Sequence, residues 1–369
     1  MTRGLTRRAL ALAGTAAVCA VTSIPLAAVA GPGSAAPAKT PQTYEVGLFG
    51  DMPYGDYGRA HYPAVLRSMN SADLAFSVFD GDIKNGKEPC YATFDGSAQA
   101  AGQPDVYRYA LARFNRLKAP VVVTPGDNEW TDCDRTSIDP HFDANGRLAY
   151  ERRLFYPTNQ SLGQHTMTLT RQSKAYPENT RWQRGRVTYL TLNIPGSDNN
   201  WVNPYRDGDS QGPAAESHRE YRARNKANLA WLDASFAAAK QANSQAVMIV
   251  IQADMWDPYA AADNALGHYA DTKAELARLV IDYRKPVVLV NGDSHSFEVD
   301  KPLADASTTN ASGGDGPNVI ENFTRVTTFG DYQNHWASAT IDPKDPNVFS
   351  FHQHIVAANV PEYTPPAAP

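Results

Sequence analysis

The sequence predicts an α/β fold in which two β-sheets pack face to face and helices cover their outer surfaces. The first observation behind this prediction is that helix-like stretches alternate with strand-length apolar runs early in the chain. The second is that the later apolar runs are short and suit antiparallel strands. The third is that four apolar runs end in Gly-Asp, which is typical of buried strands that stop at one edge of a sheet.

The four runs with this Gly-Asp ending are rich in Val, Leu or Phe. They are Tyr44–Phe49, Leu74–Phe79, Pro120–Val123 and Val287–Val290. Because Gly makes a tight turn easily, the carboxylate after it is expected to point into the crevice at the carboxyl ends of the strands. Four carboxylates in one crevice repel one another unless a cation holds them. These acids therefore predict a metal site, most simply a binuclear one. They are Asp51, Asp82, Asp127 and Asp293.

The remaining elements follow from hydrophobic periodicity. In the expected helix Ala214–Lys240, the side chains of Leu229, Leu232 and Phe236 share one face. Two further helices are expected at Val106–Leu117 and Thr272–Arg284. Further strands are expected at Arg186–Asn193, Ala246–Ile251, Asn322–Phe329, Trp336–Ile341 and Val348–Ile355. The Gly- and Asn-rich segment Thr308–Gly316 is expected to be a surface loop.

Both ends of the chain are expected to lie outside the fold. Thr6-Arg7-Arg8-Ala9-Leu10, an Ala-rich apolar stretch and Ala28-Val29-Ala30 together read as a twin-arginine signal peptide over residues 1–30. Gly14 and Pro25 break the apolar stretch, which is also too short to suit a membrane span. Residues 31–42 then form a flexible leader, 43–358 one domain, and 359–369 a Pro/Ala tail. We therefore expect a secreted or extracytoplasmic protein without a membrane anchor, exported by the twin-arginine machinery.

Charge and cysteine content narrow the function classes further. Removal of the signal takes away three arginines and no acids, so the formal charge moves from −5 to −8. This acidic balance argues against nucleic acid as a general partner. Cys90 and Cys133 remain, each just downstream of a Gly-Asp. In an exported chain such a pair favours a disulfide over two free thiols. Metal ligation by sulfur is less favoured because no Cys-x-x-Cys spacing exists.

The order of five motifs carries a family resemblance. They are Gly50-Asp51-Met52-Pro53, Gly81-Asp82-Ile83-Lys84-Asn85, Gly126-Asp127-Asn128-Glu129, Gln252-Ala253-Asp254 and Gly292-Asp293-Ser294-His295. This series resembles the calcineurin-like metallophosphoesterase superfamily, to which purple acid phosphatases belong. Its pattern is Asp-x-His, Gly-Asp, Gly-Asn-His-Asp/Glu, a lone His after a strand, and Gly-His-x-His. The resemblance implies the helix-flanked two-sheet sandwich of that superfamily for residues 43–358.

The resemblance also implies roles for individual residues. Asp51 and His295 would bind a first metal ion, and Asp82 would bridge two ions. Asp127 and Asp293 stand at second-metal positions where the family has Asn and His. Gln252, or Asp254 beside it, stands at the lone His and would be a ligand or lie behind the ligands.

Other positions depart from the family pattern. Pro53 replaces the His of Asp-x-His. Asn85 replaces the Tyr that colours purple acid phosphatases, so an iron–tyrosinate centre is not expected. Asn128 replaces the His that positions substrate and protonates the leaving group. Asn85 and Glu129, like Asp254, are expected behind the ligands or on the substrate side, and the alternative for Glu129 is that it caps the turn or forms an ion pair. Tyr54, Lys84, Asn193 and His335 are candidates for contact with substrate, but we expect each of them at the rim without a role.

The substitutions have chemical consequences for the expected cofactor, one or two divalent metal ions. Carboxylates in place of imidazole and amide favour Mn²⁺, Mg²⁺ or Ca²⁺ over zinc, with Fe and Zn remaining as alternatives. Asn128 can hydrogen-bond a phosphoryl oxygen, but it cannot act as a proton-donating acid near neutral pH. Substrates with good leaving groups are therefore expected.

The function implied by the resemblance is that of an exported phosphoesterase. A metal-bound hydroxide would attack the phosphorus of a phosphorylated small molecule, with Asn128 and His295 at the catalytic centre. The alternative is a catalytically degenerate metal- or phosphate-binding module of the same fold, because the family histidines are missing at positions 53 and 128. A hydrolase of another class lacks support, since the sequence has no Gly-x-Ser-x-Gly motif.

Overall fold

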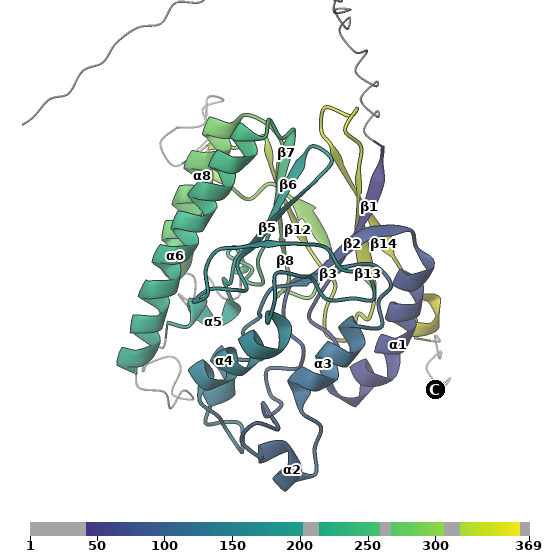
Figure 1. Cartoon of the computed structure of the whole chain (residues 1–369), viewed down its shortest axis with the longest axis vertical. Coiled ribbons are helices and arrows are strands. Elements are labelled where there is room, and N and C mark those ends of the chain that lie inside the picture. Colours follow the sequence, from purple (N-terminus) through teal and green to yellow (C-terminus); the bar gives the residue numbers. More distant parts are fainter. Residues whose placement is uncertain (1–41, 202–213, 259–266, 306–317, 362–369) are drawn as a thin grey trace, which may run out of the picture. The chain divides into compact units, whose positions relative to one another are not determined.

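The computed structural model contains two large β-sheets with flanking helices, which confirms the predicted α/β sandwich (Figure 1). The structure describes residues 42–201, 214–258, 267–305 and 318–361. The expected signal peptide, most of the leader and tail, and the loop at 308–316 lie outside these residues. Across the described ranges, none of the helices combines the length and the apolar character that crossing a membrane requires.

The first sheet has five strands in the order β14-β13-β1-β2-β3. Its strands are β1 (Tyr44–Phe49), β2 (Leu74–Phe79), β3 (Val121–Val123), β13 (Trp336–Ile341) and β14 (Phe349–His354). Strands β1, β2 and β3 run parallel, whereas β13 is antiparallel to both β1 and β14. The register pairs Phe49 with Phe79 and Phe79 with Val123. The three parallel strands therefore stop side by side.

The second sheet has seven strands in the order β4-β5-β6-β7-β8-β12-β9. They are β4 (Thr170–Arg171), β5 (Thr180–Arg184), β6 (Val187–Thr191), β7 (Ala246–Val250), β8 (Val287–Asn291), β9 (Glu298–Asp300) and β12 (Phe323–Thr327). Strands β6, β7, β8 and β12 are parallel. A separate pair comprises β10 (Ala304–Asp305) and β11 (Asn318–Val319).

The helices are α1 (Gly55–Ser71), α2 (Ser97–Ala101), α3 (Val106–Phe114), α4 (Ala144–Phe155), α5 (Gly196–Asn199), α6 (Ala214–Gln241) and α8 (Ala270–Tyr283). The outer faces of the two sheets are covered by α1, α3, α4, α6 and α8. Short 3₁₀ turns are η1 (Thr131–Asp134), η2 (Gly267–Tyr269) and η3 (Ala357–Asn359). Figure 1 shows α6 and α8 side by side on the second sheet, and α1 beside the first sheet.

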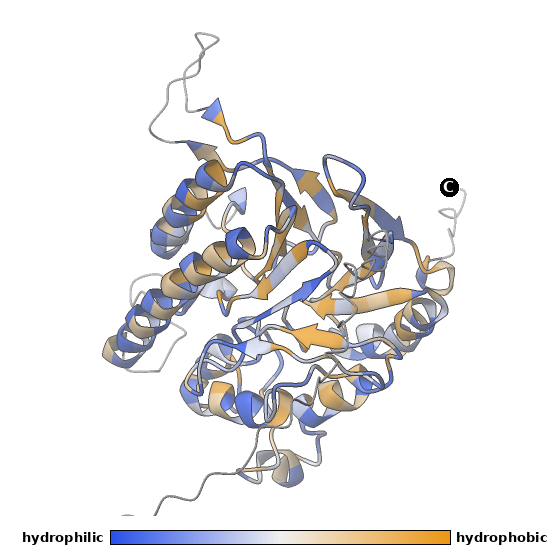
Figure 2. Ribbon diagram, turned by 45° about the horizontal axis from the view of Figure 1, so that its top comes forward, coloured by the Kyte–Doolittle hydropathy of each residue, from blue (hydrophilic) through white to orange (hydrophobic). Residues whose placement is uncertain are grey.

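Three apolar layers follow from the alternation of side chains along each strand. Leu48 and Val78 face the space between the sheets, where they join Val290 of the second sheet. Their neighbours Phe49 and Phe79 point the other way and pack under α1, α3 and α4. On the far side, strands of the second sheet pack against α6 and α8. Figure 2 shows these strands as the apolar interior. Burial on both faces explains why the runs read as continuously apolar.

Some elements differ from the sequence-based expectation. Strand β12 is parallel to β8, not antiparallel, because the chain between them is long enough to cross back to the same end of the sheet. Helix α3 ends at Phe114, short of Leu117. Helix α1 was not expected because it contains Gly58 and Pro63. Burial of its apolar face, including Tyr62, stabilises it despite these poor helix formers.

Candidate metal centre

The carboxyl ends of the parallel strands of both sheets meet at one rim. Two side-chain hydrogen bonds connect the sheets there. Thr124 Oγ1, just after β3, donates to the carbonyl of Leu192, just after β6, at 3.1 Å. Thr328 Oγ1, just after β12, donates to Asp80 Oδ2, just after β2, at 2.9 Å. The turns that carry the Gly-Asp motifs are therefore brought together from segments far apart in the sequence.

Asp51, Asp82 and His295 form the centre of this rim. One donor atom from each lies within 4.8 Å of the other two, which is a spacing that a single metal ion can bridge. Asp51 and Asp82 are buried, whereas the His295 side chain is 32% exposed. His295 Nε2 lies 3.3 Å from Asp51 Oδ1. Two carboxylates and an imidazole thus converge at a point that solvent can reach from the His295 side.

Asp127 and Asp293 lie next to the group formed by Asp51, Asp82 and His295, but they are not part of that three-residue group. Their carboxylate oxygens lie 2.7 and 2.9 Å from the point that a Cβ on Gly196 would occupy. The Asp293 amide donates to Asp51 Oδ1 at 3.1 Å. Gln252 Nε2 donates to Asp82 Oδ2 at 3.2 Å and to Asp127 Oδ1 at 3.1 Å. All four carboxylates of the Gly-Asp motifs therefore belong to one contiguous polar cluster.

The backbone of the Gly-Asp turns differs from what the sequence suggests. The left-handed residues are mainly the acids and not the glycines before them: φ is 48° at Asp51, 67° at Asp82 and 72° at Asp293. His295 has φ 63° as well. Such conformations are uncommon for residues other than Gly, although Asp tolerates them better than most, and they concentrate at functional sites.

The glycines instead make room for the carboxylate of a neighbouring motif. A Cβ on Gly126 would lie 2.0 Å from Asp82 Oδ1, and a Cβ on Gly292 would lie 2.1 Å from Asp51 Oδ2. Both contacts are far too close for a real side chain. The repeated Gly-Asp pattern therefore reflects close packing of the motifs against one another.

Electrostatic repulsion is strong in the cluster. Burial raises the pKa of Asp82 well above its usual value, and the charges of Asp127, Glu129 and other neighbours raise it further. Burial followed by the charge of Asp127 does the same to the pKa of Asp293. Burial opposes protonation of His295, but the hydrogen bond and charge of Asp51 outweigh it, so the pKa of His295 is raised. A bound divalent cation would remove this repulsion.

Asn128 and Tyr54 contact the Asp82 carboxylate directly. Asn128 Nδ2 donates to Asp82 Oδ2 at 2.7 Å and to Tyr54 Oη at 2.8 Å. Tyr54 Oη donates to Asp82 Oδ2 at 2.8 Å and lies 3.3 Å from Asp51 Oδ1. Tyr54 is 5% exposed, so its assignment to the rim was wrong. Only the fold shows this, because the turn after Asp51 directs the ring inward.

Three residues expected behind the ligands have other partners. Glu129 Oε1 accepts the amides of Gly126 and Asp82, at 2.6 and 3.2 Å, so Glu129 caps the turn. Asn85 Oδ1 accepts the amide two residues along the chain, at Lys87, within an exposed turn. The Asp254 carboxylate is taken up by other side chains. Its oxygens accept from Arg325 Nη1 and Ser294 Oγ, each at 2.5 Å.

Asp80 is a buried carboxylate of the site that the sequence analysis missed. It lies between β2 and Gly81 and is 0% exposed. Burial and then the charge of Asp51 raise its pKa well above the usual value. Its Oδ1 has no hydrogen-bond partner among the described residues. The sequence feature that could have revealed Asp80 is its position directly before the second Gly-Asp motif, Gly81-Asp82. Lys84 was also misplaced at the rim, since it is 2% exposed.

The disulfide between Cys90 and Cys133 is confirmed, with its Cα atoms 5.7 Å apart. It joins the loops that follow Asp82 and Asp127. Both sulfurs lie near the Asn128 carbonyl, at 3.5 and 3.8 Å. The disulfide therefore supports the backbone of the turn that carries Asn128.

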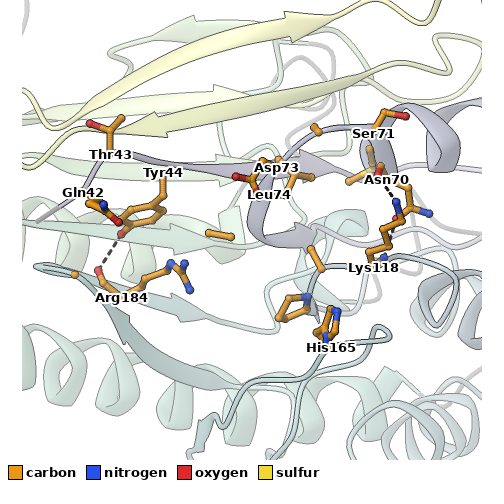
Figure 3. A pocket seen from close by; sticks show the side chains of 16 residues that line it. Gln42, Thr43, Tyr44, Asn70, Ser71, Asp73, Leu74, Lys118, His165 and Arg184 are labelled. Atoms are coloured by element: carbon orange, nitrogen blue, oxygen red, sulfur yellow. Dashed lines mark hydrogen bonds between the residues drawn. The ribbon is translucent and has the colours of Figure 1, made fainter.

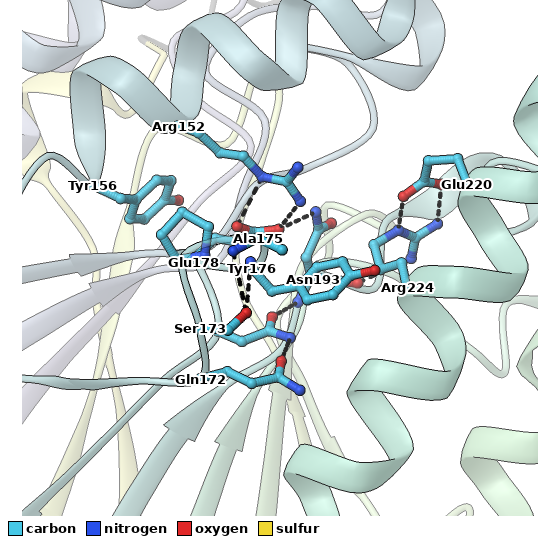
Figure 4. Close-up of polar contacts among 12 residues, drawn as sticks. Arg152, Tyr156, Gln172, Ser173, Ala175, Tyr176, Glu178, Asn193, Glu220 and Arg224 are labelled. Carbon is cyan, nitrogen blue, oxygen red and sulfur yellow. Dashed lines mark hydrogen bonds and ion pairs between the residues drawn. The ribbon is translucent and has the colours of Figure 1, made fainter.

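A buried polar network supports the other side of the site (Figure 4). Glu178 is 0% exposed and accepts from Arg152 Nε at 2.9 Å and from Asn193 Nδ2 at 3.2 Å. Arg224 of α6 donates to the Asn193 carbonyl at 3.0 Å. Asn193 was expected at the rim, but it is buried and fixes the chain just before Ile194, whose carbonyl accepts the Gln252 amide. This network therefore holds the segment that carries Gln252.

A cavity of about 920 Å³ lies away from these residues (Figure 3). Its lining includes Tyr44 and Leu74, the first residues of β1 and β2, Lys118 just before β3, and Arg184, the last residue of β5. The first three of these positions are at the amino ends of the parallel strands, opposite the rim with the carboxylates. The cavity is therefore separate from the candidate metal centre.

Comparison with known proteins gives little information on activity. No protein-family model and no curated protein matches the chain. Among solved structures, phosphopantetheinyl hydrolase from Mycobacterium tuberculosis is similar at 12% sequence identity, over 77% of this chain and 89% of that chain, with a TM-score of 0.35. A similarity at this level does not indicate what this chain does.

Proposed function

We propose that this chain is an exported, metal-dependent phosphoesterase of the calcineurin-like type. The observation that carries the proposal is the convergence of Asp51, Asp82 and His295 donor atoms within 4.8 Å at the carboxyl ends of the strands. Asp127 and Asp293 beside them supply further oxygen donors. This set suits one or two hard divalent cations, because carboxylate oxygens are the ligands that such ions prefer.

Divalent ions bound here would supply Lewis-acid stabilisation of a phosphoryl group. The chain's own residues position the ligands. Tyr54 Oη and Asn128 Nδ2 donate hydrogen bonds to Asp82 Oδ2. Gln252 Nε2 donates to both Asp82 and Asp127 and so links the two carboxylates. Asn128 has no acidic proton to give at neutral pH, so an ester is expected to be cleaved fastest when its leaving group needs no protonation.

The proposal is tested by assaying the chain from residue 31 onward after chelation and reconstitution with Mn²⁺, Mg²⁺, Ca²⁺, Fe²⁺ or Zn²⁺. Aryl and alkyl phosphate esters serve as substrates. We expect hydrolysis of aryl esters that depends on added metal and is lost in chelator. Hydrolysis that is indifferent to chelator would contradict metal dependence.

The second candidate is a metal- or phosphate-binding module without turnover. The observation in its favour is that the family histidines are Pro53 and Asn128 here. If the reconstituted protein binds metal and phosphate but cleaves no ester with any metal, this second function holds in place of the first.

Export through the twin-arginine route belongs to the same proposal. The buried Cys90–Cys133 disulfide supports an oxidising compartment outside the cytoplasm. Fractionation of producing cells tests it: the chain should leave the cytoplasm, and replacing Arg7 and Arg8 with Lys should retain it there. Export that continues without the arginine pair would contradict this route.

A further inference from the structure

We propose that Tyr57 and Tyr332 form an aromatic platform at the mouth of the candidate metal centre, and that this platform binds the leaving group of a phosphate ester of a phenol. The proposal rests on the proposed function and adds a substrate class to it. It is drawn from the exposure of the two tyrosines and from the hydrogen bonds that place their segments beside the metal centre.

Tyr332 lies on a loop that is anchored to two of the candidate ligands. The Asp331 amide donates to the Asp51 carbonyl at 2.9 Å, and the Gly330 amide donates to the His295 carbonyl at 3.1 Å. A Cβ on Gly330 would lie 2.7 Å from His295 Cδ2, so the loop packs against the imidazole ring. Consecutive Cα atoms are about 3.8 Å apart, so the Tyr332 Cα lies within about 8 Å of the Gly330 Cα. The Tyr332 backbone is therefore close to the partly exposed His295 side chain.

Tyr57 lies in the first turn of α1, which begins directly after Tyr54. Tyr54 Oη donates to Asp82 Oδ2, and the Tyr54 carbonyl accepts the Gly58 amide at 2.8 Å. The Tyr57 ring stacks on the His61 ring with centroids 3.9 Å apart, which holds it in a defined orientation on the helix surface. The second tyrosine is therefore also fixed on a segment that leads directly from the metal centre.

One side chain joins the two segments. Asn359 Nδ2 donates to the Asn334 carbonyl at 2.7 Å and to the His61 carbonyl at 3.2 Å. Asn334 Nδ2 in turn donates to the Tyr332 carbonyl at 3.3 Å. The loop that carries Tyr332 is therefore attached to the helix that carries Tyr57, and both tyrosines belong to the same side of the metal centre.

Both rings are available to a ligand that arrives from solvent. Tyr332 is 67% exposed, which is the highest exposure of any large apolar side chain in the described part of the chain, and Tyr57 is 45% exposed. Single exposed apolar side chains are ordinary on a protein surface. Two exposed rings on joined segments beside a catalytic centre are a more specific feature, because Tyr supplies a large and rigid contact area at a low cost in conformational entropy.

The charges beside the platform disfavour an anionic leaving group. Asp56 precedes Tyr57, and Asp331 precedes Tyr332. Arg59 lies one turn along α1, but it already forms ion pairs with Asp56 and a second acid. Carboxylates on both segments repel a further negative charge, whereas they do not repel a neutral ring. A neutral aromatic group therefore suits this surface.

The chemistry of the site restricts the leaving group further. Asn128 has no acidic proton to give, so the leaving group has to depart without being protonated. A phenol meets both conditions, because it is aromatic and leaves as an anion that is much less basic than an alkoxide. Offset or edge-to-face contact between such a ring and Tyr332 corresponds to about a 3- to 10-fold change in binding.

The test compares two esters that differ in the ring but not in leaving-group acidity. They are a phenyl phosphate and a fluorinated alkyl phosphate whose alcohol is as acidic as the phenol. The variants are Tyr332→Ala, Tyr332→Phe and the double variant Tyr57→Ala/Tyr332→Ala. Phe94→Ala is the control, because Phe94 is 46% exposed and its ring packs 4.5 Å from that of Tyr150 on α4. The measurements are kcat and KM for both esters, and bound metal.

We expect the wild type to prefer the phenyl ester. Tyr332→Ala should lower kcat/KM for the phenyl ester about 3- to 10-fold, mainly through KM, and that for the alkyl ester by less than about twofold. Tyr332→Phe should keep the preference because it keeps the ring, the double variant should lose more of it, and Phe94→Ala should lose none. Metal content should be unchanged throughout. Equal losses with both esters, no preference in the wild type, or an equal loss in Phe94→Ala would overturn the proposal.

The inference and the proposed function can fail separately. If the metal-loaded wild type cleaves no ester, the proposed function fails, and calorimetry with phenylphosphonate and methylphosphonate then tests the platform alone. We expect phenylphosphonate to bind about 3- to 10-fold more tightly, and Tyr332→Ala to remove most of this difference. Equal affinity of the wild type for the two phosphonates, or binding of neither, overturns the inference.

Discussion

Replacing Asp293 with Asn should stabilise the metal-free protein and should reduce the stability that the protein gains when it binds metal. Asp293 and Asp127 oxygens flank Gly196 and lie within about 6 Å of each other. Two unit charges at this separation repel by about 3 kcal/mol at an effective dielectric constant near 20. Protonation already relieves part of this, because the pKa of Asp293 is raised by burial and by Asp127. The gain should therefore be about 1–3 kcal/mol in chelator.

The substitution is mild in other respects. The Asn carbonyl can still accept the Asp254 amide, which lies 3.1 Å from Asp293 Oδ2. With metal at about 100 times its Kd, the wild type gains about 2.7 kcal/mol. A variant whose affinity is weakened about 100-fold by the lost charge gains only about 0.4 kcal/mol. The stability difference between variant and wild type should therefore shift by about 2.3 kcal/mol in favour of the wild type when chelator is replaced by metal.

The assay is thermal unfolding of both proteins in chelator and in Mn²⁺. Each kcal/mol corresponds to about 2 °C in a chain of this size. Glu151→Gln is the matched control, because Glu151 is fully buried with no hydrogen-bond partner for either oxygen among the described residues. It should stabilise the protein equally in both conditions. An Asp293→Asn variant that gains as much from Mn²⁺ as the wild type would refute the reasoning.

Three further predictions concern stability and turnover. In chelator, stability should fall by on the order of 2–3 kcal/mol as the pH rises from about 4.5 to 7, because burial raises the pKa of Glu129 to about 7 and the folded state binds that proton more tightly. Urea unfolding at pH 5 and 7.5 measures this, and a rise in stability would contradict it. Replacing both Cys90 and Cys133 with Ser should cost about 4 kcal/mol by the chain-entropy relation for their separation of 43, and a loss below about 1 kcal/mol in guanidinium unfolding would oppose it. Asp82→Ala should abolish metal binding and activity together, whereas Asn128→Ala should keep the metal and lower the rate roughly 10- to 100-fold; equal metal loss in both variants would show that Asn128 is needed for the site itself.

The positions of the strands that carry the site could be predicted from the sequence more accurately than the side-chain contacts within the site. The runs Tyr44–Phe49 and Leu74–Phe79 coincide with β1 and β2 because strands buried on both faces show an unbroken apolar pattern. The helices α1 and α4 were missed because they depend on tertiary burial more than on a clear helical pattern. Parallel pairing of β12 was missed because strand direction depends on the path of the connection.

Within the site, the Gly-Asp repeat predicted which carboxylates approach one another. The inward position of Tyr54 could not be read from the sequence, because it depends on the left-handed turn at Asp51. The burial of Asp80 depends on Thr328 from the other sheet. The hydrogen bond between Ser197 and Asp127 joins residues that lie 70 positions apart in the sequence. Such contacts come from the docking of the two sheets and leave no local pattern.

The measurement that tests the account most directly is the metal content of the protein from residue 31 onward, reconstituted with Mn²⁺ and passed through a desalting column. We predict about one or two divalent ions per chain in the wild type, and almost none in a variant with both Asp51→Ala and His295→Ala, because the donors that converge within 4.8 Å are then removed. A wild-type protein that retains no metal, or a double variant that retains as much as the wild type, would contradict the assignment of this cluster as a metal centre.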